Sequence, residues 1–258
     1  MAAENRQYYK HYIIDFPGIV EMLVSEFAEK NGVRINVIIP TLNEEKNIID
    51  LILRLKQCGC HDILIIDGHS TDDTVKHARQ LGARVIIQNG QGKGGALREA
   101  FEDSCLDGDI IVVMDADGSM DPEELQSFLK ALETGVDVVK GSRFLPGGGS
   151  EDLTPVRRVG NMILTGLLNS LFFTSYTDLC YGYIAFRKEA LDKLSRHLTT
   201  NNFEIETEIC IKAKTLSLKV LEIPSFERSR RFGKSNLSAV RDGAGILKLL
   251  LGEAIRTD

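Results

Sequence analysis

The sequence lacks any run of apolar residues long enough to cross a lipid bilayer. A membrane-spanning helix needs about 18 or more consecutive, mostly apolar residues. The nearest candidate, Met162 to Phe173, is shorter and contains Asn169 and Ser170. We therefore expect a protein that does not span a membrane by itself, although this apolar helix leaves peripheral docking on a membrane surface open.

Cysteine is scarce and odd in number, with five in 258 residues, and no signal peptide precedes them. Disulfide-stapled secreted proteins pair an even number of cysteines, so we expect a reduced, cytoplasmic protein. Cys58 and Cys60, followed by His61, could suggest a zinc site. Because no second pair of ligands accompanies them, we interpret this cluster as the end of a helix.

The composition is that of an ordinary globular protein, with 43% hydrophobic and 26% charged residues. Its net charge of -6 argues against a surface that coats nucleic acid. The length fits one large α/β domain or two small ones, and the sequence has no repeats or low-complexity segments. We expect residues 1–33 to form an extension, with a helix over Ile19 to Lys30, and residues 34–258 to form a single domain.

From residue 34 onward, strand patterns alternate with helix patterns. Apolar runs predict strands at 34–40, 62–67, 84–88, 110–115, 136–140, 184–187 and 218–223. Periodic apolar positions predict helices between them, and further helices at 96–101, 122–132, 157–173, from 203 and at 237–255. This alternation is typical of βαβ units and indicates a mostly parallel sheet flanked by helices.

Two carboxylates, Asp115 and Asp117, follow the buried strand at 110–115, and Pro122 then opens a helix. Open α/β sheets bind their ligands at the carboxyl ends of the strands. Carboxylate oxygens at this position suit Mg²⁺ or Mn²⁺, which keeps waters and ligand phosphates in its shell. The alternative is that the acids form only a polar turn that caps the helix.

Three other strands also end in polar groups. Asn43 and Glu44 follow the first strand, Asp67 the second and Lys93 the third. Four such endings at one sheet edge predict a crevice large enough for a nucleotide. The glycine-rich loop at 89–95 matches neither the Walker phosphate loop nor the dinucleotide fingerprint, so neither an NTPase nor a dehydrogenase is supported.

The second half contains two further loops of interest. The glycine run at 141–149 is typical of a mobile loop that closes on a substrate. The segment 227–237 gathers four cations beside glycine and phenylalanine, which favours a phosphate clamp over a solvated face.

Taken together, these motifs resemble family-two glycosyltransferases, and most closely the dolichol-phosphate mannose or glucose synthase branch. The resemblance covers about residues 34 to 250. It rests on the motifs Pro40 to Glu44, Asp67 to Thr74, Gly92 to Gly94, Asp115 to Asp117, Gly141 to Arg143 and Arg228 to Leu237.

The resemblance implies a GT-A fold, with a nucleotide-binding half at 34–120 and an acceptor half at 121–258. It also implies a UDP- or GDP-linked sugar donor and a divalent Mg²⁺ or Mn²⁺. By this likeness the base and ribose pocket would be formed by Pro40, Asn43, Glu44 and Asp67, with Lys93 near the nucleotide. The metal would be held by Asp115, which also faces the ribose, by Asp117 and by Ser119.

The resemblance also assigns a set of phosphate-binding residues and leaves the acceptor open. The donor diphosphate or an acceptor phosphate would contact Arg143, Arg157, Arg228, Arg230, Lys234 and Ser235. A polyprenyl phosphate, the expected acceptor, is already anionic and needs no general base. A hydroxyl acceptor on a soluble metabolite or glycan would need one, and the candidates are Asp178, Glu206 and Glu208, for which helix capping or a salt bridge is the alternative.

Two departures from the family pattern bear on the acceptor more than on the donor. Gly68 stands where many relatives carry a second acid. The segment from Cys180 to Tyr183 replaces a Ser-Gly-Phe-like segment of the lipid-phosphate branch.

Two other classes of protein remain open at this point. A nucleotidyltransferase would need a loop rich in glycine and arginine after its first strand, and the segment from Pro40 to Glu44 does not provide one. A non-catalytic binding module should tolerate loss of Asp117.

Overall fold

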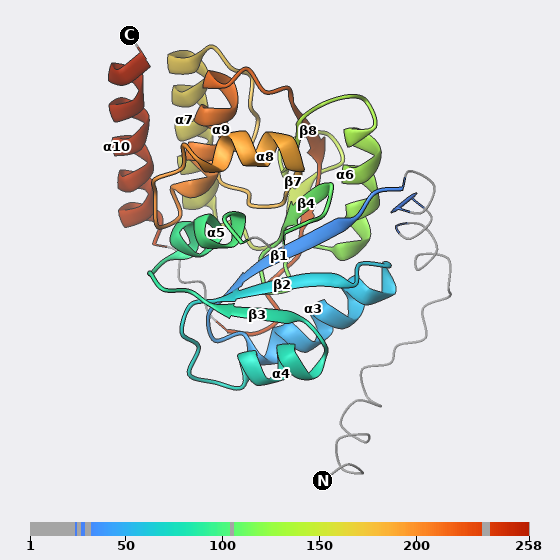
Figure 1. Cartoon of the computed structure of the whole chain (residues 1–258). Helices are drawn as coiled ribbons and strands as arrows, with labels where there is room; N and C mark the ends of the chain where they lie inside the picture. The colour runs from blue at the N-terminus through green and yellow to red at the C-terminus, as the bar shows by residue number, and fades with distance from the viewer. Residues whose placement is uncertain (1–23, 25–26, 29–31, 104–105, 234–237, 258) are drawn as a thin grey trace, which may run out of the picture.

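The computed structural model describes residues 24, 27–28, 32–103, 106–233 and 238–257 (Figure 1). The predicted N-terminal helix over Ile19 to Lys30 therefore lies largely outside the described residues. Within it, Val24 is buried in the core, and Phe27 and Ala28 pack against the same cluster.

The first half of the domain consists of alternating strands and helices. In chain order they are β1 (Ile35–Thr41), α3 (Glu45–Gln57), β2 (Asp62–Asp67), α4 (Thr74–Gln80), β3 (Arg84–Ile87), α5 (Lys93–Phe101) and β4 (Ile110–Val113). Helix α3 ends where the Cys58–His61 cluster begins, which confirms the interpretation of that cluster as a helix end.

The second half is richer in helix. It contains η1 (Pro122–Glu124), α6 (Leu125–Leu132), β5 (Val138–Ser142), β6 (Gly149–Ser150), α7 (Pro155–Phe172), β7 (Ile184–Arg187), α8 (Lys188–Ser195), α9 (Ile205–Thr215), β8 (Val220–Pro224), β9 (Phe226–Glu227) and α10 (Ala239–Thr257).

One seven-stranded sheet, in the order β3-β2-β1-β4-β7-β5-β8, joins both halves (Figure 1). All neighbouring strands run parallel except β7, which is antiparallel to both β4 and β5. The predicted mostly parallel α/β fold is confirmed. The carboxyl ends of β1, β2, β3 and β4 meet at one edge, because these strands are parallel.

Helices cover both faces of the sheet. Apolar side chains of α3, α4 and α6 pack on one face, and those of α5, α8 and α9 pack on the other. Helices α7 and α10 form an additional layer outside α9, through a separate apolar cluster that includes Leu168, Ile211 and Leu250. Among the described residues, no helix combines the length and the apolar character needed to cross a membrane.

The structure differs from the sequence prediction in two segments. Helix α8 was not predicted, because it follows β7 without a turn signal between them. The glycine run at 141–149 is not one loop: its first two residues end β5, and Gly149 begins β6. Strand β6 pairs with β9 through Gly149 and Phe226, so the predicted substrate-closing loop is anchored at both ends.

Candidate active site

A cavity of about 890 Å³ opens at the carboxyl edge of the sheet and extends to helices α7 and α10. One end of it is polar and is lined by Pro40, Glu44, Lys93, Asp115, Asp117, Ser119, Glu206 and Arg230. The other end is largely apolar and is lined by Leu153, Val156, Ile163, Leu164, Leu167, Val240, Ile246 and Leu247. The cavity thus combines a charged site with an apolar groove.

The acid pair lies on the loop after β4, because the buried strand ends at Val113. Asp117 Oδ1 accepts a hydrogen bond from the Ser119 N–H at 3.0 Å. Its other oxygen is 2.6 Å from an Arg230 guanidinium nitrogen. Asp115 instead pairs with Lys93, whose Nζ is 2.5 Å from its Oδ1. Both carboxylates line the cavity, each with a cation beside it.

Lys93 links two carboxylates across the polar end of the cavity. Its Nζ lies 2.7 Å from Glu206 Oε1 as well as beside Asp115. Burial alone would lower the pKa of Lys93, but the charges of Asp115 and Glu206 raise it above its ordinary value. The two flanking carboxylates therefore favour the charged form of Lys93. A Cβ at Gly182 would lie 2.9 Å from the Lys93 ammonium, so the absence of a side chain there leaves room for this group.

The oxygen ligands at the polar end of the cavity suit a divalent ion that the protein shares with a substrate phosphate. They do not form a metal site built from protein ligands alone. Within the part of the chain that the structure describes, no group of three or more histidine, cysteine or acidic side chains could hold a metal. Mg²⁺ and related ions commonly bind one or two carboxylates and complete their shell with water and substrate phosphates. Asp115 and Asp117, with the Ser119 hydroxyl nearby, fit that pattern.

The cations of the predicted phosphate clamp do not all point into the cavity. Arg230 lines the cavity and reaches Glu44 at 3.3 Å as well as Asp117. Burial raises the pKa of Glu44, and contacts with Asn47 and Arg230 partly offset this. Arg228 does not line the cavity, because it turns to the buried Asp121. Lys234 and Ser235 lie outside the described residues.

Asn43 and Asp67 bond to the turn after β2, and their side chains are not part of the cavity wall. Their assignment to a base and ribose pocket stays a prediction. Asp67 is buried and accepts hydrogen bonds from the backbone N–H and hydroxyl of Ser70. Asn43 Oδ1 accepts the Thr71 N–H at 2.8 Å. The wall at this end is formed by residues that the sequence argument missed, namely Leu42, Gly68, His69, Gln88 and Gln91. Two of them, Gly68 and His69, lie within the motif from Asp67 to Thr74.

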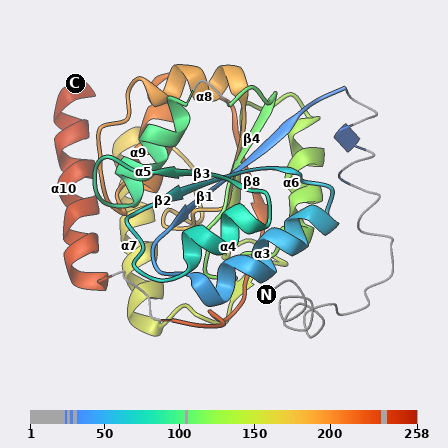
Figure 2. The ribbon, with the colours of Figure 1, turned by 60° about the horizontal axis from the view of Figure 1, so that its bottom comes forward.

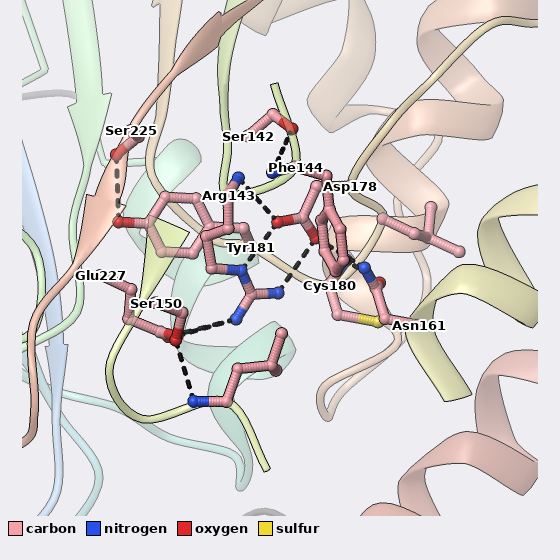
Figure 3. Close-up of polar contacts among 12 residues, drawn as sticks. Ser142, Arg143, Phe144, Ser150, Asn161, Asp178, Cys180, Tyr181, Ser225 and Glu227 are labelled. Atoms are coloured by element: carbon pink, nitrogen blue, oxygen red, sulfur yellow. Dashed lines mark hydrogen bonds and ion pairs between the residues drawn. The ribbon is translucent and has the colours of Figure 1, made fainter. Parts of the chain in front are cut away.

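Arg143 lines the cavity and is held by two carboxylates (Figure 3). Its Nε and one terminal nitrogen donate to Asp178 at 2.7 and 3.0 Å. The other terminal nitrogen donates to Glu227 at 3.1 Å. The guanidinium also lies over the Tyr181 ring, 4.9 Å from its centroid. These contacts fix the orientation of the guanidinium and occupy most of its N–H donors.

The geometry does not support Asp178 as a general base. Its side chain is fully buried, and Asn161 donates a further hydrogen bond to it at 3.0 Å. Burial would raise its pKa, but the hydrogen bonds and charge of Arg143 hold the pKa below its ordinary value. A carboxylate that is already paired and has a low pKa is a poor proton acceptor.

Glu208 is also engaged elsewhere. It accepts hydrogen bonds from the N–H groups and hydroxyls of Thr199 and Thr200, and it does not line the cavity. Of the three predicted bases, only Glu206 faces the cavity. Arg157, at the start of α7, also lines it.

The comparisons with known proteins agree with this geometry. Residues 36–195 match glycosyl transferase family 2. Glycosyltransferase AglJ of Haloferax volcanii is 34% identical over 226 residues, which cover 86% of this chain and 72% of the relative. A polyprenol monophosphomannose synthase of Mycolicibacterium smegmatis is 32% identical, with 78% and 80% covered. A dolichol-phosphate mannosyltransferase of Pyrococcus furiosus is 31% identical, with 79% and 59% covered.

A solved structure supports the fold. Glucosyl-3-phosphoglycerate synthase of Mycobacterium tuberculosis, crystallised with Mn²⁺, UDP and glucosyl-3-phosphoglycerate, has a TM-score of 0.69 and 21% identity. The match covers 93% of this chain and 86% of that one. The family match includes the acid pair, Lys93 and Arg143, around which the cavity is built. On these grounds the chain belongs to glycosyl transferase family 2 and is a glycosyltransferase with the GT-A fold.

Proposed function

We propose that the protein transfers a hexose, with inversion at the anomeric carbon, from a UDP- or GDP-linked sugar to a polyprenyl phosphate. The observation that carries this proposal is the cavity itself, which joins an acid-lined end to an apolar groove between α7 and α10. A donor diphosphate needs the first environment, and an isoprenoid chain needs the second. Family membership argues against the nucleotidyltransferase and binding-module alternatives.

The donor end would hold a divalent ion through Asp115 and Asp117. Such an ion, when bound, neutralises the negative charge that develops on the departing nucleoside diphosphate. Arg230, 2.6 Å from Asp117, is placed to add a second positive charge at the same point. The Mn²⁺ and UDP named for the mycobacterial structure support this assignment. The proposal leaves Mg²⁺ and Mn²⁺ as equivalent candidates.

The acceptor end favours a group that is already negatively charged. Arg143 and Arg157 line the cavity near the α7 end, and they would draw a phosphate toward the donor. An anionic phosphate needs no proton acceptor, which agrees with the engagement of Asp178 and Glu208 by other partners. The names of the relatives from Pyrococcus furiosus and Mycolicibacterium smegmatis support a lipid phosphate. As part of this proposal, the protein acts in the cytoplasm at a membrane surface.

A second candidate keeps the donor and replaces the acceptor with a hydroxyl on a soluble metabolite or glycan. One observation favours it: the Glu206 carboxylate lies in the cavity, 2.7 Å from Lys93, where it could accept a proton.

The two candidates are separated by a transfer assay. A panel of UDP- and GDP-hexoses is incubated with or without a polyprenyl phosphate, in Mg²⁺, Mn²⁺ or EDTA. We expect a glycolipid product from one donor, only with the metal. Transfer to soluble hydroxyl acceptors alone would favour the second candidate.

A binding assay tests the donor site independently of the acceptor. UDP or GDP should raise the melting temperature only when Mg²⁺ or Mn²⁺ is present. An equal rise in melting temperature with and without the metal would count against the assigned site.

A further inference from the structure

Two helices at the edge of the molecule present apolar side chains to solvent. A helix that buries one face in the core normally presents polar side chains on its other face. Helices α7 and α10 both depart from this rule, because each also exposes apolar side chains. The exposed apolar residues, which we call the α7–α10 surface, are Val156, Val159, Met162, Ile163, Val240, Leu247, Leu251 and Ile255.

The members of this surface are aligned along each helix. In α10, Leu247, Leu251 and Ile255 follow one another at intervals of four residues, which places them on one side of the helix. In α7, Val156, Val159 and Ile163 have the matching spacing of three and four. The two helices lie side by side in both views (Figures 1 and 2). Members of both stripes line the same cavity, which places the stripes on one side of the molecule. Neighbouring apolar side chains of this number usually mark a binding surface.

The cavity opens within the α7–α10 surface. Four residues are both exposed and part of the cavity wall, namely Val156, Ile163, Val240 and Leu247. A second copy of the chain seated on this surface would cover the cavity mouth and block the acceptor. A lipid surface that itself carries the apolar acceptor would not block it.

The charges beside this surface are positive, although the protein as a whole is negative. The chain has a net charge of -6, yet α7 and α10 together carry five basic and two acidic side chains. One of the two acids, Glu253, is buried and pairs with Lys212 and Arg256. The other, Asp242, accepts the Ser238 N–H at 2.6 Å. Arg157 pairs with Asp152 at 3.8 Å. The other basic residues of the two helices are Arg158, Arg241 and Lys248, and their charge is complementary to an anionic partner.

We infer that the α7–α10 surface docks on a lipid bilayer that contains anionic lipids, an inference that rests on the proposed lipid-phosphate acceptor. The apolar side chains enter the boundary between headgroups and acyl chains, and the basic side chains remain at the level of the lipid phosphates. In this orientation the cavity mouth faces the membrane. The acceptor phosphate can then reach Arg157 while its isoprenoid chain passes along the apolar groove and stays out of water.

The test is cosedimentation of the full chain with vesicles of phosphatidylcholine alone or mixed with phosphatidylglycerol. The wild type should bind the mixed vesicles more strongly, and added salt should weaken this preference. The double variant Val159→Glu/Ile255→Glu places charges on the surface at two exposed positions that do not line the cavity. We expect its binding to weaken about tenfold or more. Ile87→Glu, at a half-exposed apolar position on β3, is the matched control and should bind like the wild type.

A second measurement separates this inference from the proposed function. The double variant should transfer sugar normally to a short, water-soluble isoprenyl phosphate and poorly to a polyprenyl phosphate embedded in vesicles. Vesicle binding without transfer to any acceptor would overturn the proposed function and leave the surface intact. The inference is overturned if the wild type remains in the supernatant, or if the double variant binds as it does. A wild-type dimer that the double variant loses, seen by light scattering, would also overturn it by assigning the surface to a second copy.

Discussion

Asp115 and Asp117 lie two residues apart on one loop, yet each is paired with a cation from a different part of the chain. Lys93 comes from the start of α5, and Arg230 comes from the segment before α10. The polar end of the cavity is therefore assembled from three distant segments. Substituting Asp117 should affect chemistry more than folding, because its carboxylate borders the cavity and is only partly buried.

Replacing Asp117 with asparagine keeps the shape of the side chain and removes its charge. If Asp117 holds the divalent ion, transfer should fall about 100-fold or more, because the charge of the leaving diphosphate is no longer neutralised. The melting temperature should change little. The measurement is initial-rate transfer alongside thermal unfolding, with Asp192→Asn in α8 as the control at an exposed carboxylate. Normal turnover by the Asp117 variant would contradict the assigned metal site.

Asp178 should behave as a structural anion. In Asp178→Asn the Arg143 guanidinium stays buried with one of its two carboxylate partners neutralised. Breaking such a buried pair costs about 3–5 kcal/mol in the free energy of unfolding. Urea denaturation at neutral pH measures this loss, and Asp192→Asn again serves as the control. A change below 1 kcal/mol would show that the pair contributes little.

The same pair predicts how stability depends on pH. The pKa of Asp178 is lower in the folded protein than its ordinary value of 3.8. Its stabilisation is therefore fully present above pH 3.8 and is lost as the pH falls through the lower, folded-state pKa. The difference in melting temperature between wild type and Asp178→Asn should be constant from neutral pH into mild acid and should shrink below pH 3.8. A difference that grows in acid would refute this assignment.

At the scale of elements, the glycine-rich loop before α5 serves close packing. A Cβ on Gly94 would lie 2.6 Å from the Thr200 carbonyl oxygen and 2.9 Å from that of Asn202. Gly92 has a φ of +81°, and a Cβ there would lie only 2.2 Å from the Asn201 carbonyl oxygen. The loop thus holds the first turn of α5, including Lys93, against the segment that leads into α9 and Glu206. This contact explains Gly92 and Gly94 without a phosphate.

Gly94→Ala should therefore destabilise the protein, although alanine is the better helix former. The clash is with backbone atoms, which cannot move aside as a side-chain tip can, so we expect a loss of about 1–3 kcal/mol. Gly95→Ala is the matched control in the same helix turn, since its nearest neighbour would be at 3.7 Å. It should be neutral or stabilise by up to about 1 kcal/mol. Chemical denaturation of both variants measures the contrast, and equal effects would contradict it.

At the scale of the whole molecule, the central sheet interleaves the two halves of the sequence. Strand β7, from the second half, lies between β4 and β5 and pairs with both. The first half ends in β4, so its edge is completed only by a strand about 70 residues later in the chain. The predicted division into a nucleotide half and an acceptor half can describe function, but neither half has a complete sheet of its own.

The protein should consequently unfold in one cooperative transition. Phe186→Ala removes a fully buried ring on β7 that contacts Phe101 from the first half. We expect a loss of about 3–5 kcal/mol and a single transition shifted to lower temperature. Differential scanning calorimetry measures both. Two separate transitions, of which only one moves, would show that the halves fold independently.

The alternation of apolar strands and amphipathic helices was readable from the sequence by itself, because each pattern depends on neighbouring residues only. The same holds for the clustering of Asp115, Asp117, Glu44 and Lys93 at one edge, since parallel strands end on the same side. The antiparallel entry of β7 and the short pairing of β6 with β9 were not readable, because strand direction and pairing depend on distant segments.

The tertiary structure alone decided which charged groups are available for chemistry. Asp178, Glu206 and Glu208 were equivalent candidates in the sequence. Arg143 lies 35 residues from Asp178 and 84 residues from Glu227 in the sequence. No local sequence pattern can therefore predict these two ion pairs. Ion pairs and burial are set by the three-dimensional packing of such distant side chains. For that physical reason the sequence determined the fold class and the sheet edge at which the polar groups gather. Only the fold determined that Glu206 faces the cavity while the other two acids support the structure around it.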